Sequence, residues 1–459
     1  MSPMTPAALE TAFKAIEGDP LEIEQQPPEP GRPGRLRMTV LADDLGRVQV
    51  IHREDTLLDI DALNRSLARD CRAIRKPDEA KLRSKHQLYS LPPVPYLTRF
   101  ETVVDAGVKD LDSVSFDNGM GNADLAMSFG SYRRLLPSST RWIDCAKPIA
   151  DIAVNLGAPE QDEAQLRSAI QQFTGLRIQQ RLDDTLELPP LPDTAQRIIH
   201  LRMNPNAEVG ELADIVESDP SLAAQVVSWA SSSFYQSRTP VRSIYDAIMR
   251  VLGFELVMNL AMGLALGRTL QQPDDEPDGF IGYWNQSIWM AQATSTVVGM
   301  MPRRDRPEFG LAYLSGLLHN FGYLVLAHVF PPHFTLVCRF TEANPHLDTS
   351  YIEHHLIGLT REQIGSQLMG LWEMPEQVIH AMRYQKNPHY DGDYSTYANV
   401  IYLARAMLAE RNIRVGPTMD VPDELYQRLG ISPDKLAEEM DMLVNSASDI
   451  TAMAQIMAK

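Results

Sequence analysis

The chain has 459 residues, of which 44% are hydrophobic and 22% are charged. This length exceeds one hydrophobic core of ordinary size, so two or three domains are expected, and the composition excludes a largely disordered or fibrous protein. The formal net charge of −18 is unevenly distributed: residues 1–150 carry 20 Lys and Arg against 22 Asp and Glu, which leaves 22 against 38 for residues 151–459. We expect the acidic C-terminal part to repel nucleic acid.

Three features of the sequence indicate where in the cell the protein is expected: its cysteines, its apolar stretches and its first thirty residues. Cys71, Cys145 and Cys338 are far apart and odd in number, so neither a disulfide framework nor a Cys-x-x-Cys metal site is expected. The longest apolar stretches, such as 257–266, are shorter than the ~20 residues that a bilayer requires. The first thirty residues are acidic and proline-rich, unlike a secretory signal. The sequence therefore predicts a cytoplasmic protein with no membrane segment.

The N-terminal third is predicted to mix helices and strands. A Pro-rich lead, residues 1–34, is expected to be flexible, and an α+β domain is expected over 35–140. Its first element is a β-hairpin, because two alternating apolar segments flank an Asp-Asp-Leu-Gly turn. The segments that carry these predictions are 36–41, the turn 43–46, 48–52, a helix from Asp61, and strands at 102–105 and 113–116.

One stretch of this domain, from Arg65 to Lys85, is locally basic. It includes Arg69, Arg72, Arg75 and Lys76, a cluster that fits contact with phosphate. A solvated helix face explains the same pattern, and the sequence alone favours that alternative.

From residue 141 onward a helical period dominates. Residues 141–185 are predicted to form a helical connector, and the Leu-Pro-Pro-Leu-Pro run that begins at Leu188 marks a domain boundary, since no helix continues through it. Asp219-Pro220 predicts a helix start, because Asp caps free amides and Pro needs no N–H at the first position. We expect an all-α domain over 186–395, with helices of 396–459 packing on it. The expected helices include 243–252, 255–269, 283–300, 310–329, 351–355, 362–372, 376–384, 397–410 and 433–457.

Six motifs of this helical part, in the same order, resemble the HDOD family, a catalytically degenerate relative of the HD-type metal-dependent phosphohydrolases of bacterial signalling proteins. The resemblance implies a helical bundle and a role in signal transduction. The motifs are Leu188–Pro192, Glu217–Leu222, Ala247-Ile248 with Leu252-Gly253, Trp284, Gly316–His319, and Gly365 with Leu371–Pro375.

The resemblance also implies where a catalytic metal pair would be held, and the sequence departs from active enzymes there. Such enzymes hold hard cations with imidazole and carboxylate ligands. Of the corresponding positions only His319 keeps a ligand type; the others hold amides, which are poor ligands, or cations, which cannot ligate. We therefore expect no bound metal, no cofactor and no metal-dependent hydrolysis. The positions are Gln286, His319, Asn320, Arg361, Gln385 and Lys386, with Trp284 beside them.

Residues 35–136 resemble the YbaK/ProX family of domains that hydrolyse mischarged aminoacyl-tRNA. In active members a strand lysine positions the substrate, and the amides of a glycine-containing loop orient the ester. Here the lysine position holds Arg37, and the loop 89–95 contains Ser90, Pro92 and two further prolines, which supply no N–H. The motifs are Arg37–Val40, the helix 60–68 with Cys71–Ile74, Val103–Asp105, and Val114–Phe116 before Gly119–Gly121.

The two resemblances together imply a non-catalytic signalling or scaffold protein with two degenerate hydrolase folds. Its expected partner is a protein of a signalling pathway, or a nucleotide or aminoacyl-tRNA-like ligand, and self-association into a homo-oligomer is compatible with the C-terminal helix. The alternative is a trans-editing aminoacyl-tRNA deacylase that acts through the N-terminal domain. A nucleic-acid-binding regulator is disfavoured by the acidic C-terminal half.

Overall fold

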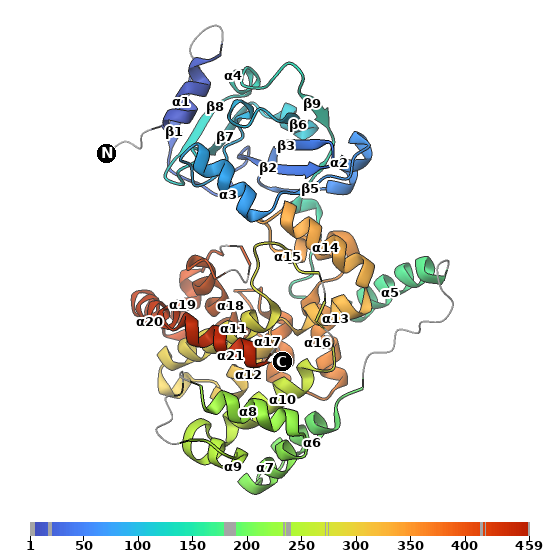
Figure 1. Cartoon of the computed structure of the whole chain (residues 1–459), viewed down its shortest axis with the longest axis vertical. Coiled ribbons are helices and arrows are strands. Elements are labelled where there is room, and N and C mark those ends of the chain that lie inside the picture. Colours follow the sequence, from blue (N-terminus) through green and yellow to red (C-terminus); the bar gives the residue numbers. More distant parts are fainter. Residues whose placement is uncertain are drawn as a thin grey trace. The chain divides into compact units, whose positions relative to one another are not determined.

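The computed structural model describes the chain in two compact units (Figure 1). Unit 1 contains Met1–Ala153, Pro277–Gly279 and Thr335–Leu356; unit 2 contains Val154–Glu276, Phe280–Phe334 and Ile357–Lys459. Within these ranges, the residues described are all except 1–4, 17–20, 179–189, 233–234, 236–239, 271, 274, 414–415, 418 and 458–459.

The described residues of unit 1 form three β-sheets. The largest has the strand order β5-β2-β3-β6-β9, in which β2 runs antiparallel to β3 and β5 whereas β3, β6 and β9 are parallel. A second, antiparallel sheet has the order β1-β8-β7, and β4 pairs with β10. The strands are β1 (Glu24–Gln26), β2 (Leu36–Asp43), β3 (Gly46–Arg53), β4 (Thr56–Leu58), β5 (Arg72–Ala73), β6 (Glu101–Asp105), β7 (Ser113–Asp117), β8 (Asp124–Ser128), β9 (Arg141–Ile143) and β10 (Ala146–Pro148).

Four α-helices occur among the described N-terminal residues of unit 1, so its predicted α+β character is confirmed. The predicted hairpin is β2–β3, and Asp59 caps α2 by accepting a hydrogen bond from the Ala62 N–H. Helix α1 and strand β1 lie within the lead that was expected to be flexible. Leu9 and Ala12 on one face of α1 are buried in the core, which fixes this helix. The helices are α1 (Ala7–Lys14), α2 (Ile60–Leu67), α3 (Lys76–Lys85) and α4 (Phe129–Arg133).

The segment Thr335–Leu356, which carries most of α14 (Pro331–Ala343) and α15 (Thr349–Ile357), also belongs to unit 1. Asn344, fully buried, binds the backbone of Leu58 in β4: its Oδ1 accepts from the Leu58 N–H at 2.7 Å and its Nδ2 donates to the Leu58 carbonyl at 3.0 Å. The Thr39 hydroxyl donates to the Ala343 carbonyl at 3.3 Å. The Asn344 amide thus takes the place of a neighbouring strand at the edge of β4.

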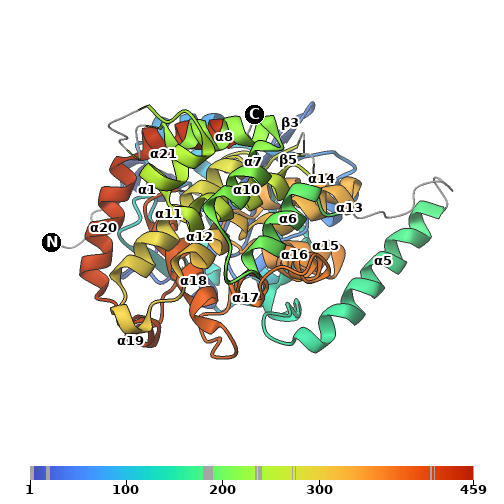
Figure 2. The same ribbon diagram turned by 90° about the horizontal axis from the view of Figure 1, so that it is seen from below.

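Among the described residues of unit 2 the regular elements are all helices, which confirms the all-α prediction. Asp219 caps α8 as expected, since its carboxylate accepts from the Ser221 and Leu222 amides. The helices are α5 (Asp162–Ile178), α6 (Asp193–Arg202), α7 (Val209–Glu217), α8 (Pro220–Ala230), α9 (Ile244–Ala247) followed by a π-helical turn (Ile248–Leu252), α10 (Phe254–Gly267), α11 (Tyr283–Met300), α12 (Phe309–Leu318), α13 (Phe321–Val329), α16 (Arg361–Leu371), α17 (Glu376–Tyr384), α18 (Ser395–Glu410), α19 (Asp423–Leu429), α20 (Pro433–Asn445) and α21 (Ala447–Met457) (Figure 2).

Two long helices expected from the sequence are each two helices. The expected helix 310–329 breaks at His319-Asn320 into α12 and α13, and 433–457 breaks at Ser446 into α20 and α21. The stretch Phe309–Val329 is apolar and long enough to cross a membrane by length and composition, so the expectation that every apolar stretch is too short for this was wrong. It is 94% buried, so its apolar surface is that of a core element.

Candidate functional site

The positions expected to hold metal in an active relative lie on four neighbouring parts of unit 2. Gln286 is on α11, His319 and Asn320 form the break between α12 and α13, and Arg361 is the first residue of α16. Gln385 and Lys386 directly follow α17. We call these six residues the polar cluster.

Two glycines allow α13 and α16 to approach closely and so bring parts of the polar cluster together. A Cβ atom on Gly322 would lie 1.9 Å from the Arg361 carbonyl oxygen, and one on Gly365 would lie 3.0 Å from the Gly322 Cα. No larger residue fits at that spacing without moving a backbone. Thr360 fixes the start of α16 through a capping box with Gln363, which places Arg361 at the crossing.

A continuous hydrogen-bond chain joins three members of the polar cluster. The Asn320 Nδ2 donates to the Gln286 Oε1 at 3.1 Å, and the Arg361 Nη1 donates to the Asn320 Oδ1 at 3.0 Å. Gln286 is itself held by its Nε2, which donates to the Ile281 carbonyl at 2.6 Å. The Gln385 Nε2 donates to the His319 carbonyl at 2.7 Å. The structure therefore brings the expected residues together, bound to one another or to backbone.

His319 and Lys386 complete the polar cluster. His319 is 6% exposed, and its Nδ1 lies 2.8 Å from the Gly316 carbonyl oxygen, which is the local hydrogen bond expected for a packing histidine. Burial, with the nearby cations Arg405, Arg361 and Lys386, lowers the pKa of His319 to about 3. Lys386 forms an ion pair with Glu362 at 2.9 Å, and both side chains are almost fully buried.

This donor set does not fit a divalent metal. Within the described ranges, no three His, Cys, Asp or Glu residues come together as a metal site would require. Two carboxylates lie next to the polar cluster, and both are paired: Glu362 with Lys386 and Asp162 with Arg383. Glu362 was not foreseen as part of the site, although a carboxylate next to Arg361 in a buried helix start was a visible signal. Trp284 has a packing role, because its ring lies against Gly267 of α10.

A buried ion pair lies beside the polar cluster and anchors the start of the connector helix α5. The Asp162 carboxylate accepts hydrogen bonds from the Arg383 Nε at 2.5 Å and Nη2 at 2.9 Å. It also accepts from the Gln363 Nε2 at 2.8 Å and the Asn155 Nδ2 at 3.1 Å. Gln363 and Arg383 are on α16 and α17, so the connector is tied to the helices that carry Arg361 and lead to Gln385.

Of the expected deacylase positions of unit 1, Arg37 lines a small cavity, whereas Ser90 and Pro92 do not line it. Arg37 on β2 is a cross-strand neighbour of His52 on β3, and burial lowers the Arg37 pKa to about 10. The cavity that Arg37 lines has a volume of about 40 Å³, and Glu342 and Pro345 also line it. The Ser90 hydroxyl donates to the Asp117 Oδ2 at 2.6 Å, and Pro92 packs close to Gly119.

The basic residues between Arg65 and Lys85 do not form one cluster of unpaired, exposed cations. Arg69 is 9% exposed and pairs with Asp43 at 2.5 Å and with Glu101 at 2.7 Å. Lys76 pairs with Glu79 at 3.0 Å. Arg72 is 61% exposed beside Asp70, and Arg75 is exposed at the start of α3. The carboxylates that hold Arg69 come from β2 and β6, far from it in sequence.

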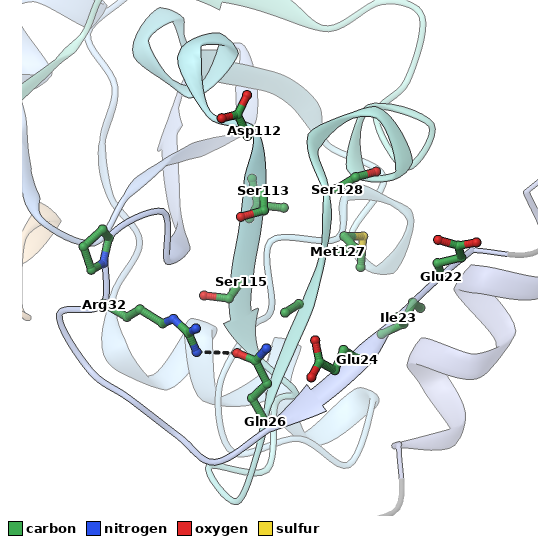
Figure 3. A pocket seen from close by; sticks show the side chains of 13 residues that line it. Glu22, Ile23, Glu24, Gln26, Arg32, Asp112, Ser113, Ser115, Met127 and Ser128 are labelled. Atoms are coloured by element: carbon green, nitrogen blue, oxygen red, sulfur yellow. Dashed lines mark hydrogen bonds between the residues drawn. The ribbon is translucent and has the colours of Figure 1, made fainter.

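Figure 3 shows a further hollow of unit 1, on the polar face of the sheet β1-β8-β7, which sequence reasoning missed. Its volume is about 550 Å³. Arg32 at its edge is hydrogen-bonded to Gln26, and Ser115 on its floor is 5% exposed with no hydrogen-bond partner for its hydroxyl among the described residues. The rim is acidic, so it disfavours phosphate groups. The carboxylates that line it are Glu22, Glu24 and Asp112.

Comparison with known proteins agrees with the family resemblance of the helical part. The sequence model of the HDOD domain matches residues 188–388. A crystal structure of a provisionally named signal transduction protein from Marinobacter aquaeolei VT8 is 50% identical, with a TM-score of 0.92, over 99% of this chain and 100% of that chain.

Two weaker similarities were also found. A curated uncharacterized protein of Treponema pallidum is 26% identical over 233 residues, which are 50% of this chain; the chain thus spans 42% of the length of that relative. A provisionally named trans-editing enzyme for prolyl-tRNA synthetase is 16% identical over 32% of this chain and 98% of that chain, with a TM-score of 0.26.

Proposed function

Because the chain belongs to the HDOD family of signalling proteins, we propose that it is a non-catalytic cytoplasmic regulator that acts by binding. The proposed partner is a protein of a signalling pathway or a nucleotide-type ligand, and the polar cluster of unit 2 is the proposed recognition site. The observation that carries this proposal is the hydrogen-bond chain from Gln286 through Asn320 to Arg361, which occupies positions that would hold metal in an active relative.

The charges of the polar cluster argue against catalysis by a divalent cation. Arg361 contributes a positive charge that deprotonation does not remove, and Lys386 is a second cation, paired with Glu362. At 4 Å from one such cation, a divalent ion would be repelled by roughly 8 kcal/mol if the effective dielectric constant is 20. Among the six residues of the polar cluster His319 is the one imidazole and none is a carboxylate, so a single neutral ligand would have to offset this repulsion.

The same charges favour an anionic partner group. Arg361 lies at the start of α16, where the helix dipole adds positive potential, and its guanidinium stacks over the Tyr323 ring with 5.1 Å between the guanidinium carbon and the ring centroid. Carboxylates and phosphates are the groups that a guanidinium binds most strongly. An acidic side chain of a partner protein and a nucleotide phosphate both satisfy this chemistry.

The small cavity of unit 1 argues against the alternative, a trans-editing deacylase. A volume of about 40 Å³ beside Arg37 has room for about one water molecule. Sites that enclose small molecules measure roughly 300–1,000 Å³. Glu342 and Pro345 line the place where an aminoacyl group would enter by the family resemblance, so unit 1 is better suited to a structural or recognition role.

The catalytic part of the proposal is tested with the full-length protein. After incubation with Mn²⁺ or Fe²⁺ and gel filtration, we expect no stoichiometric metal and no hydrolysis of bis(p-nitrophenyl) phosphate or a cyclic dinucleotide. A chelator-sensitive turnover that His319→Ala abolishes would overturn the proposal. For the alternative, mischarged alanyl-, prolyl- and cysteinyl-tRNA are incubated with the full chain; ester loss above the buffer rate that Arg37→Ala removes would support editing.

The binding part of the proposal is tested by charge reversal at Arg361. Capture of partners by full-length protein and equilibrium titration with ATP, GTP and cyclic dinucleotides are compared for the native chain and Arg361→Glu. We expect the native chain to bind a partner or a nucleotide, and Arg361→Glu to lower the affinity for it tenfold or more. The control is Arg304→Glu, because that side chain is 87% exposed. Equal binding by both variants would refute a role for the polar cluster.

A further inference from the structure

Another hollow of unit 1 lies where the parallel strands β3, β6 and β9 begin. It is walled by the end of α1, the loop that precedes β6 and the segment that precedes β9. Its volume of about 620 Å³ is within the roughly 300–1,000 Å³ of pockets that enclose small organic molecules. We call it the arginine hollow; it shares no residue with the polar cluster or with the cavity beside Arg37.

The arginine hollow has a largely apolar lining. Ile16 at the end of α1, Phe100 before β6, and Leu135 and Leu136 after α4 contribute carbon surface, and Pro95 and Pro137 add to it. Leu135 is 7% exposed and Ile16 and Phe100 are half-buried, so these side chains form a fixed surface backed by the core of unit 1. Such a surface favours a ligand with an apolar body.

The open side of the arginine hollow carries an uncompensated cation. Arg99 is exposed, and its guanidinium carbon lies 4.7 Å from the centroid of the Tyr96 ring. Among the described residues no carboxylate pairs with it. Arg47 is arranged in the same way, 5.6 Å from the centroid of Phe100. A guanidinium stacked on a ring keeps its N–H groups at the edge, where they can bind a carboxylate or phosphate through two parallel hydrogen bonds.

The loop that presents Arg99 is held in place by a buried amide. Gln49 on β3 is fully buried; its Oε1 accepts from the Thr98 hydroxyl at 2.5 Å, and its Nε2 donates to the Phe100 carbonyl at 3.1 Å and to the Thr102 hydroxyl at 2.9 Å. Arg99 itself has a φ of 57°, in the left-handed region that is unfavourable for a side chain of its size. Such conformations persist where the surroundings enforce them, frequently at ligand sites.

We propose that the arginine hollow binds an organic anion with an apolar body and a carboxylate or phosphate group, with Arg99 as its anion contact. The apolar lining takes the body, and the guanidinium edge takes the charge. The acidic hollow of Figure 3 has the opposite charge preference, so the two hollows of unit 1 discriminate ligands by charge. This site is independent of the proposed role of the polar cluster.

The test is calorimetric titration of the full-length protein with octanoate, octyl phosphate and octan-1-ol. We expect saturable one-to-one binding of at least one of the two anions, and at least tenfold weaker binding of the neutral alcohol. The comparison of octanoate with octyl phosphate distinguishes a carboxylate site from a phosphate site. Arg99→Gly, which removes the guanidinium and relieves the positive φ, should weaken anion binding about tenfold or more, and Arg99→Lys should restore part of it.

A second variant separates binding from folding. Ala15 is exposed at the end of α1 and lines the hollow, so Ala15→Trp should fill it and abolish binding while leaving the thermal midpoint nearly unchanged. The control is Arg304→Ala in unit 2, which should bind as the native chain does. The proposal is refuted if neither anion binds, if octan-1-ol binds as tightly as the anions, or if Arg99→Gly and Ala15→Trp both bind normally.

Discussion

Removal of the Asp162 carboxylate should loosen the start of the connector helix α5 from α16 and α17. Asp162 is 2% exposed and accepts four hydrogen bonds, two of them from Arg383, whose side chain is 4% exposed. Asp162→Ala leaves that guanidinium buried without its counter-charge. Breaking a buried pair in this way costs about 3–5 kcal/mol, a large part of the 5–15 kcal/mol that typically holds a domain folded.

The loss can be measured as hydrogen exchange in the peptides of α5, α16 and α17. Since about 1.4 kcal/mol corresponds to tenfold in an equilibrium constant, a cost of about 3–5 kcal/mol lowers amide protection by roughly 100- to 4,000-fold if these helices open together. The double variant Asp162→Leu with Arg383→Met removes both charges and should recover most of that protection.

The matched control is the next residue along the helix. Glu163 pairs with Arg167, but both side chains are 72% exposed, so Glu163→Ala should change protection less than twofold. The reasoning fails if Asp162→Ala lowers protection less than tenfold, or if the double variant is as unstable as Asp162→Ala alone.

Three further perturbations follow from the described contacts. Burial lowers the pKa of His52 to about 3, below its ordinary value of 6.5, so as the pH falls the unfolded chain binds the proton before the folded chain does. The free energy of unfolding should therefore fall by up to about 1.4 kcal/mol per pH unit between about pH 6.5 and 3. In His52→Gln, the urea-unfolding midpoint should depend less on pH over that range. Gly322→Ala places a Cβ atom 1.9 Å from the Arg361 carbonyl oxygen and should lower the free energy of unfolding by about 1–3 kcal/mol or more. An unchanged melting temperature would show that α13 and α16 separate easily. Asn344→Ala strips two hydrogen bonds from Leu58 and should cost about 2–4 kcal/mol by urea denaturation, whereas Asn204→Ala, at an exposed turn, should cost far less.

Much of the helical part could be predicted, because its signals are local. The ends of the helices 283–300 and 376–384 were predicted as the structure has them, and the Asp219 cap was visible in two letters of sequence. The break at His319-Asn320 was not foreseen. Both sides of that break are apolar and buried, so the apolar pattern continues through it. The local signal was Asn320, a residue type common at helix starts, which stands at the N-cap position of α13.

The residues of the candidate site could be predicted from the sequence, but the hydrogen bonds and ion pairs between side chains could not. The family resemblance placed Gln286, Asn320 and Arg361 at equivalent positions, and the structure joins them by hydrogen bonds. The pairing of Arg69 with Asp43 and Glu101 could not be foreseen, because it depends on the order of strands in the sheet. Contacts that depend on the order of strands in a sheet or on how helices cross have no characteristic spacing in the sequence, so they could not be predicted from it.

The membership of Thr335–Leu356 in unit 1 has a consequence for synthesis on the ribosome. The first stretch of this unit ends at Ala153, yet the amide that binds Leu58 is residue 344. At roughly 5–20 residues per second, about 10–40 s separate the emergence of these two parts. During that interval the edge of β4 is exposed, and a nascent chain with an unpaired strand edge is a substrate for chaperones and for mispairing. A chain released before residue 344 would lack the side chain that closes that edge.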